Sequence, residues 1–319
     1  MTSSCGILWD IYDIQMNYLA PQHSLESNNE YQVIWNLSDI QAPTITGAPD
    51  KIIVEGLKKG KVSRTTIFGV DSKSGDIIWE IPGSTSESII AHDNTLYRGT
   101  VGITTVYAHN IDNGELLWST WLPSAHSTST IYFADNKIFV FSNDGEFYVL
   151  NEQGEILDKF YQTSDTFLKI DGVLYVSKNY SLRAVDHSSR EELWQLDIGE
   201  HFTAPIFNDG EIFLKTWNYS ADIYSIDQYI GKINWMTSQN VQSNLCLCGD
   251  KMYFTSPDGE LVAIDRYSSN EISRVKFSPQ FDLDKQIGDY YVACDATNNV
   301  LAISFGDNTQ IMGLKIMNP

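Results

Sequence analysis

Apolar and polar residues alternate in short runs along most of the chain, and these runs recur at a nearly constant interval. One kind of run reaches an Asp or Asn, passes through a turn and resumes with aliphatic residues before a Trp, as in residues 70–79 (VDSKSGDIIW) and 226–235 (IDQYIGKINW). The Asp or Asn side chain can accept hydrogen bonds from backbone amides two residues on, and glycine supplies the left-handed conformation that the turn needs. This pattern predicts a hairpin whose outer strand carries a packing tryptophan.

Six segments of this kind align, and four of them contain the tryptophan. The spacing is regular, with 39 residues from Trp79 to Trp118 and 41 residues from Trp194 to Trp235. A second hairpin precedes each one, with Asp-Gly or Asp-Asn at its junction in several repeats, which is a strong hairpin signal. Two hairpins in series make one four-stranded sheet in about 40 residues. The sequence therefore predicts an all-β fold, a single β-propeller of seven four-stranded blades.

The repeat also predicts how the chain is divided. We expect the propeller domain to span residues 31–319 and residues 1–30 to form an N-terminal extension, either an arm or an extra strand around residues 7–12. The innermost strands are expected to begin near residues 43, 87, 129, 166, 203, 243 and 281. Two closures of the ring remain open. Residues 31–37 complete the last blade, or residues 311–316 complete it and residues 31–37 are added outside.

The Asp-x₃-Gly-x₃-Trp hairpins resemble the repeats of the quinoprotein-like (PQQ-like) propeller family, over about residues 31–316. The resemblance implies the fold but no single activity, because the family includes quinone-dependent dehydrogenases, an outer-membrane assembly lipoprotein and binding scaffolds. Its dehydrogenases are longer and exported, and they carry two adjacent cysteines beside the cofactor and a calcium ion close to it. This chain has no Cys-Cys pair. We therefore expect no enzyme activity, no catalytic residue and no bound cofactor or metal.

The charge of the chain limits the kinds of partner that we expect it to bind. With 41 acidic and 21 basic residues, the formal net charge is −20. Such a surface repels phosphate backbones and anionic lipids, so we expect neither nucleic acid nor a membrane as the ligand. It favours association with a basic protein. No basic side chain precedes Lys51 and no apolar run of a secretory signal is present, which predicts a cytoplasmic location and disfavours an exported assembly scaffold.

Cysteine and histidine give no sign of a chemical centre. The cysteines are residues 5, 246, 248 and 294, and the C-x-C pair at 246–248 has no second pair or histidine at metal-binding spacing nearby. We expect buried free thiols. The six histidines show no metal-binding spacing, and no nucleophile elbow or phosphate-binding glycine loop is present.

The function predicted on these grounds is a non-catalytic protein-binding scaffold, and in a narrower form an acidic immunity-type neutraliser of a basic partner. Aromatic residues outside the repeat's tryptophan position are the candidate anchors, since Trp and Tyr dominate interface hot spots. These are Trp121, Trp217 and Tyr219, although each also fits a place in the core. The alternative is a small-ligand, metal or enzymatic site in the central channel. The binding face and the oligomeric state are left open.

Overall fold

The computed structural model describes fourteen ranges of the chain: residues 24–25, 30–58, 65–82, 86–100, 105–123, 128–134, 136–142, 146–161, 166–178, 180–203, 205–217, 221–278, 291–305 and 310–317. All regular elements in these ranges are β-strands. Within the same ranges, no helix is long and apolar enough to cross a membrane.

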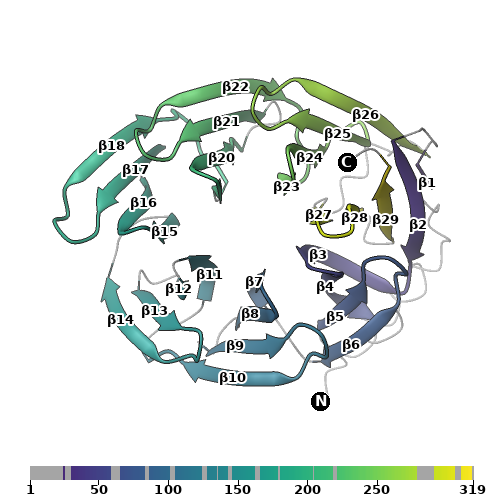
Figure 1. Cartoon of the computed structure of the whole chain (residues 1–319), viewed down its shortest axis with the longest axis horizontal. Coiled ribbons are helices and arrows are strands. Elements are labelled where there is room, and N and C mark those ends of the chain that lie inside the picture. The colour runs from purple at the N-terminus through teal and green to yellow at the C-terminus, as the bar shows by residue number, and fades with distance from the viewer. Residues whose placement is uncertain are drawn as a thin grey trace, which may run out of the picture.

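The strands form seven antiparallel sheets arranged as blades around a common axis (Figure 1). In each blade the first strand lies nearest the axis and the fourth strand lies at the rim (Figure 1). Six sheets have four strands and one has a fifth, short strand. The predicted seven-bladed, all-β propeller is therefore confirmed.

The first four blades follow the chain in order. Blade 1 contains β3 (Ile40–Ala48), β4 (Lys51–Lys58), β5 (Thr66–Asp71) and β6 (Ile77–Pro82). Blade 2 contains β7 (Ser86–His92), β8 (Thr95–Thr100), β9 (Thr105–Asn110) and β10 (Leu116–Trp121). Blade 3 contains β11 (Thr128–Ala134), β12 (Lys137–Ser142), β13 (Glu146–Asn151) and β14 (Ile156–Tyr161). Blade 4 contains β15 (Thr166–Ile170), β16 (Val173–Lys178), β17 (Ser181–Asp186) and β18 (Glu192–Asp197).

The last three blades include the strands that close the ring. Blade 5 contains β19 (Ile206–Asn208), β20 (Glu211–Lys215), β21 (Ala221–Asp227) and β22 (Ile233–Gln239). Blade 6 contains β23 (Cys246–Cys248), β24 (Lys251–Thr255), β25 (Glu260–Asp265) and β26 (Glu271–Ser278), with β1 (Ser24–Leu25) outside β26. Blade 7 contains β27 (Tyr291–Asp295), β28 (Val300–Ser304), β29 (Ile311–Ile316) and, as its rim strand, β2 (Tyr31–Leu37).

Blade 7 combines a strand from early in the chain with three strands from its C-terminal part. Strand β2 runs antiparallel to β29, with Tyr31 opposite Ile316 and Leu37 opposite Ile311 (Figure 1). Residues 31–37 therefore complete the last blade, which decides between the two closures. The first strand of blade 7 is described from Tyr291, which pairs with Ser304 of β28, and the start expected near residue 281 lies outside the described residues. The extra strand expected around residues 7–12 lies outside the described residues.

The core consists of seven apolar clusters, and each one lies between two neighbouring blades. The cluster between blades 7 and 1, for example, contains Trp35, Ile40, Val54 and Ala302. Alternation along each strand directs side chains to both faces of a blade, and both faces are covered by the next blade. Apolar burial between blades therefore holds the ring together.

A tryptophan on the rim strand links five of the seven blades to the blade that follows. Each indole N–H donates to a carbonyl in the next blade's turn between third and fourth strands, at 2.7–3.1 Å, from Trp35, Trp79, Trp118, Trp194 and Trp235. Trp79 also covers Gly69 on the paired strand, where an added Cβ would lie 2.1 Å from the indole. The tryptophans are packing residues, as the repeat predicts.

Two blades lack this tryptophan, and their interfaces are built differently. Blade 6 has Ser273 at the position, and its hydroxyl makes a buried 2.9 Å hydrogen bond with the Tyr31 hydroxyl of blade 7. Blade 3 has Asp158 there, and the facing turn of blade 4 carries Arg190 at the position that four of the other turns fill with glycine. Those glycines lie against the indoles, as Gly154 does, where a Cβ would lie 2.6 Å from Trp118. Without the indole, a larger residue fits.

Candidate functional site

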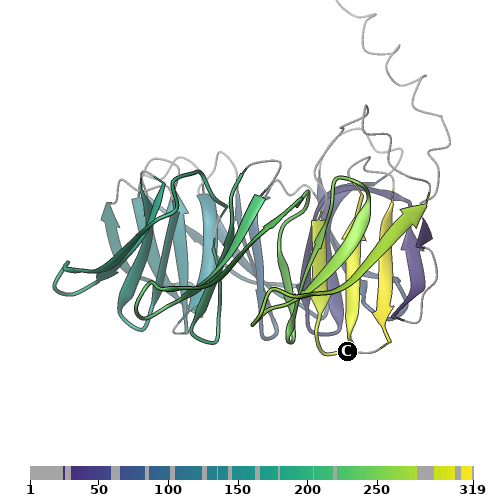
Figure 2. The same cartoon turned by 90° about the horizontal axis from the view of Figure 1, so that it is seen from above.

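The two faces of the ring carry different connections. Because the strands alternate in direction, the turns between first and second strands and between third and fourth strands lie on one face, which we call the tight-turn face. The other connections lie on the opposite face, which we call the loop face. In the edge-on view of Figure 2 the tight turns line the lower side of the ring.

Polar side chains on the tight-turn face are used to build its turns. At the end of six third strands, an Asp or Asn side chain accepts two backbone N–H groups of the turn that follows; these residues are Asp71, Asn110, Asn151, Asp186, Asp227 and Asp265. The bonds from Ser189 lower the pKa of Asp186, and bonds from Ser268 lower that of Asp265. These side chains stabilise turns, as the sequence predicts.

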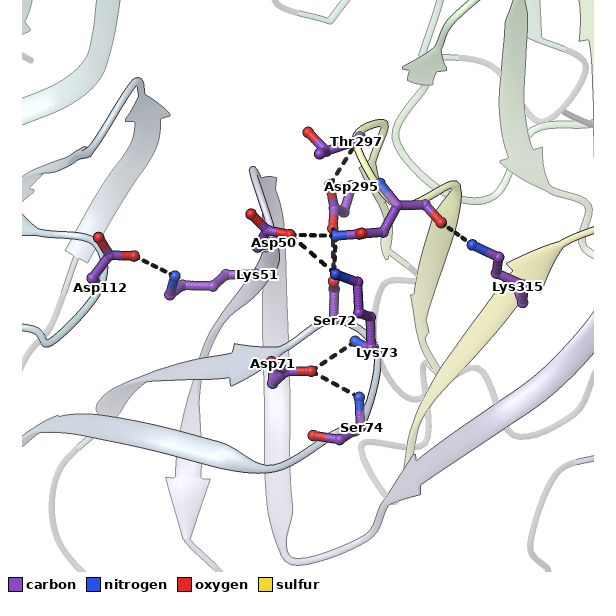
Figure 3. Close-up of polar contacts among 11 residues, drawn as sticks. Asp50, Lys51, Asp71, Ser72, Lys73, Ser74, Asp112, Asp295, Thr297 and Lys315 are labelled. Carbon is purple, nitrogen blue, oxygen red and sulfur yellow. Dashed lines mark hydrogen bonds and ion pairs between the residues drawn. The ribbon is translucent and has the colours of Figure 1, made fainter.

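A larger polar cluster lies on the tight-turn face where blades 7 and 1 meet (Figure 3). The buried carboxylate of Asp295 accepts hydrogen bonds from Ser72 Oγ at 2.6 Å, Asn298 Nδ2 at 2.7 Å and Thr297 N at 3.0 Å. Asn298 Nδ2 also donates to Asp50 at 2.7 Å, which lowers the pKa of Asp50. Asp295 is only 1% exposed and surrounded by donors. The hydrogen bonds of this cluster link blade 7 to blade 1 where the ring closes, and they leave the Asp295 carboxylate no reactive role.

Ion pairs make comparable links between other neighbouring blades on this face. Lys51 of blade 1 lies 2.6 Å from Asp112 of blade 2 (Figure 3). Arg266 of blade 6 lies 2.9 Å from Asp209 of blade 5. In both pairs the cation is nearly buried and the carboxylate is exposed, so each pair closes an interface and presents its acidic side to solvent.

One buried histidine has both ring nitrogens engaged. His109 Nε2 accepts from Arg98 Nε at 3.2 Å, and Nδ1 lies 3.1 Å from the carbonyl oxygen of Gly114, to which it donates. Burial lowers the pKa of His109, and so favours the neutral ring that this pattern requires. The arrangement fixes His109 in the wall of blade 2 and leaves no nitrogen for acid–base chemistry.

The cysteines correct one prediction from the sequence. Cys248 and Cys294 form a disulfide between the first strands of blades 6 and 7, with their Cα atoms 5.9 Å apart. Both stand near the end of an innermost strand, so the fold brings them together across 46 residues of sequence. Cys246 is a free thiol, as predicted, and burial raises its pKa to about 12. Cys5 lies outside the described residues.

Two of the three predicted anchors lie in the described part of the structure, and both lie on the loop face. Trp121 ends β10 and is 64% exposed, and Trp217 follows β20 and is 75% exposed. Neither is a core residue. They belong to blades 2 and 5, which are not neighbours, so the fold does not bring them together. Tyr219 lies outside the described residues.

Two further aromatic residues lie near Trp217 and were not found from the sequence. Tyr180 lies between β16 and β17 and His201 lies between β18 and β19, and their rings meet edge to face at 4.6 Å. The backbone N–H of Trp217 donates to the carbonyl oxygen of His201 at 2.9 Å. No regular spacing marks the pair, because they lie in connections of different kinds.

The described residues contain no group of three His, Cys, Asp or Glu side chains that could hold a metal ion. The fold and its two surfaces define the protein as a seven-bladed β-propeller. A family model described as outer membrane protein assembly factor BamB matches residues 63–272. This is well over half of the chain, and the chain therefore belongs to that family of PQQ-like repeat propellers.

Solved structures resemble the whole ring at low sequence identity. BamB from Moraxella catarrhalis is 15% identical with a TM-score of 0.57, and the match covers 91% of this chain and 98% of that one. The β-propeller domain of Cps50 (Swd1) from Myceliophteria thermophila is 8% identical with a TM-score of 0.68. This match covers 90% of this chain and 99% of that one. Identities this low show a shared fold alone. No curated protein matches the chain significantly.

Proposed function

We propose that this propeller is a non-catalytic scaffold that binds a basic protein partner through its loop face. The observation that carries the proposal is the exposure of Trp217, whose side chain is 75% accessible and which lies beside two other aromatic residues. Exposed aromatic side chains on a rigid frame are typical anchors of protein interfaces. The matching family is described as an assembly factor, which also favours a protein partner.

The net charge of −20 supports the choice of a basic partner. Opposite charge accelerates encounter and disfavours acidic competitors, although it adds less to the final affinity. In its narrower form, the proposal is an immunity-type neutraliser, which would occupy and block a basic toxin. Neutralisation then follows from tight capture alone and needs no chemical step by this chain.

The enzymatic alternative has less support in the described residues. Two of their buried polar groups that could take part in catalysis, Asp295 and His109, are engaged in bonds within and between blades. A channel site would need convergent polar groups open to a ligand. The groups just named are closed off, so we place the function on the surface.

The disulfide bears on where the protein works. Disulfides persist mainly in oxidising compartments and are rare where thiols are kept reduced. A cytoplasmic location, which we retain as a proposal, predicts free thiols at Cys248 and Cys294 in living cells. Alkylation of thiols in intact cells before lysis, followed by mass spectrometry, tests this directly. A modified pair supports the cytoplasm, and an unmodified pair that reacts only after reduction excludes it.

The binding proposal is tested by affinity capture from the cell's own lysate at low and moderate salt. An unrelated acidic protein of similar net charge is the control bait, because acidity alone retains basic proteins. We expect one basic protein in stoichiometric amount on this propeller and absent from the control, with less retained as salt rises. Identical proteins on both baits, or none on either, would contradict the proposal.

A further inference from the structure

Three aromatic residues lie close together on the loop face where blades 4 and 5 adjoin. Tyr180 is 47% exposed and Trp217 is 75% exposed, and His201 between them is also exposed. Tyr180 and His201 are in ring contact, and His201 is hydrogen-bonded through its carbonyl group to Trp217. We call these three residues the aromatic patch.

The backbone beneath the patch is fixed. Thr216 pairs with Phe202 in an isolated bridge, and Thr216 N donates to the carbonyl oxygen of Asp222 at 2.9 Å. The backbone N–H of Trp217 likewise donates to the carbonyl oxygen of His201. An exposed indole on a fixed backbone loses little conformational freedom when a partner covers it, which favours binding.

Tyr180 has a strained backbone conformation, and the packing of its own blade does not require a tyrosine there. Its φ is +65°, a left-handed conformation that glycine adopts freely and that bulky residues adopt at a cost. The side chain is partly exposed to solvent and contacts His201 rather than the core. Strain of this kind is often found at functional sites.

Acidic side chains flank the patch on both blades. Asp197 precedes it and Glu200 adjoins His201, and both are exposed. Glu200 and Asp222 both raise the pKa of Tyr224, after the larger effect of burial, which places the two carboxylates near one side chain. One nearby cation, Lys215, donates to the carbonyl oxygen of Ser243 at 2.6 Å. The patch therefore offers ring faces among negative charges.

We propose that the aromatic patch docks a segment of the partner protein that is rich in arginine or lysine. A guanidinium or ammonium group stacks favourably on an indole or phenol face, and arginine does so best because its planar group is weakly hydrated. Neighbouring carboxylates bind further cationic side chains of the same segment. This inference rests on the proposed function and specifies its surface and the chemistry of its ligand.

The test uses the full chain and a fluorescent peptide of alternating arginine and glycine, with binding followed by fluorescence polarisation. A peptide with citrulline in place of arginine keeps the shape and removes the charge. Trp217→Ala is compared with Trp217→Phe and with Tyr229→Ala. Tyr229 is the matched control, because it is 67% exposed but lies in a turn of the tight-turn face. None of these changes alters the net charge.

We expect Trp217→Ala to weaken arginine-peptide binding about five- to tenfold. Trp217→Phe should retain most of the affinity, Tyr229→Ala should stay within about twofold of the wild type, and the citrulline peptide should not bind. Thermal melts should show the same stability for all three variants. Equal binding by Trp217→Ala and wild type, an equal loss in Tyr229→Ala, or no binding by the wild type would overturn the proposal.

Failure of the docking site can be distinguished from failure of the proposed function. If lysate capture gives a basic partner and Trp217→Ala captures it as well as the wild type does, the patch is not the docking site and the function stands. If the wild type captures no partner that the acidic control lacks, the proposed function is wrong.

Discussion

The tight-turn face and the loop face are made from the same seven blades but use their side chains differently. On the tight-turn face, turn carboxylates accept backbone amides, turn carbonyls accept indole N–H groups, and Asp295 clamps blade 7 to blade 1. On the loop face, Trp217 and Tyr180 project into solvent and support no blade. This contrast indicates that the exposed aromatic side chains of the loop face are not needed to hold the blades together, which leaves them available to bind.

The largest expected effect is on the tight-turn side, at Trp79. Its side chain is buried, fills the interface between blades 1 and 2, and donates to the carbonyl oxygen of Ile111 at 2.9 Å. Trp79→Ala should reduce the free energy of unfolding by about 3–5 kcal/mol, measured by denaturant titration. Trp235→Ala should cost less, because that indole is only half-buried. Equal losses of unfolding free energy in the two variants would show that the exposure of the indole does not determine how much each tryptophan contributes to stability.

The next effect concerns the disulfide on the same face. Replacing both Cys248 and Cys294 by alanine should reduce the free energy of unfolding by about 2–4 kcal/mol. Cys246→Ala is the control, because Cys246 is a half-buried free thiol that takes no part in the bond. Thiol titration of the unfolded wild type should show two additional groups after reduction. An unchanged thiol count, or a double variant as stable as the wild type, would contradict this role.

A smaller and opposite effect is expected on the loop face at Tyr180. Glycine accepts the φ of +65° without steric cost, so Tyr180→Gly should raise the stability by about 1 kcal/mol while weakening the arginine peptide. Thermal melts and fluorescence polarisation measure the two effects. A loss of stability would show that the tyrosine supports the fold, and the contrast between the faces would fail at this position.

The smallest effect is the pH dependence of one turn. Hydrogen bonds from Ser268 lower the pKa of Asp265, so the ionised side chain contributes stability above its unfolded pKa of about 3.9, and this contribution is lost as the pH falls through the lower folded pKa. Asn stands at the same place in two other blades, as Asn110 and Asn151. Asp265→Asn should therefore lower stability slightly at neutral pH, and its difference from wild type should shrink below about pH 4. The difference is measured by denaturant titrations over a pH series. A difference in the free energy of unfolding between variant and wild type that stays constant or grows as the pH falls would contradict this prediction.

The repeat predicted the architecture because each blade is built from local signals. The turn Asp and the rim Trp lie eight residues apart in one hairpin, so their roles can be read in a single window. Closure was harder, because β2 and β29 are separated by almost the whole chain and no local pattern decides their pairing. The bulge one residue before Trp35 is the same as that before Trp79, and this shared feature marks β2 as a rim strand.

The surface was less predictable than the frame. Cys248 and Cys294 occupy similar places in successive repeats, and aligning the ends of the inner strands would have paired them. Trp217 stood out because it departs from the repeat. Tyr180 and His201 gave no such signal, because their contact depends on how blades 4 and 5 pack. Sequence periodicity describes what each blade shares, whereas binding surfaces arise where neighbouring blades differ.

The most direct test of the central claim is hydrogen exchange of the propeller with and without its captured partner. We predict slower exchange on the loop face, in the segments around Tyr180, His201 and Trp217, and unchanged exchange in the tight turns at 228–231 and 266–269. Protection confined to the tight turns would contradict the account, since it would place binding on the face that we assign to stability.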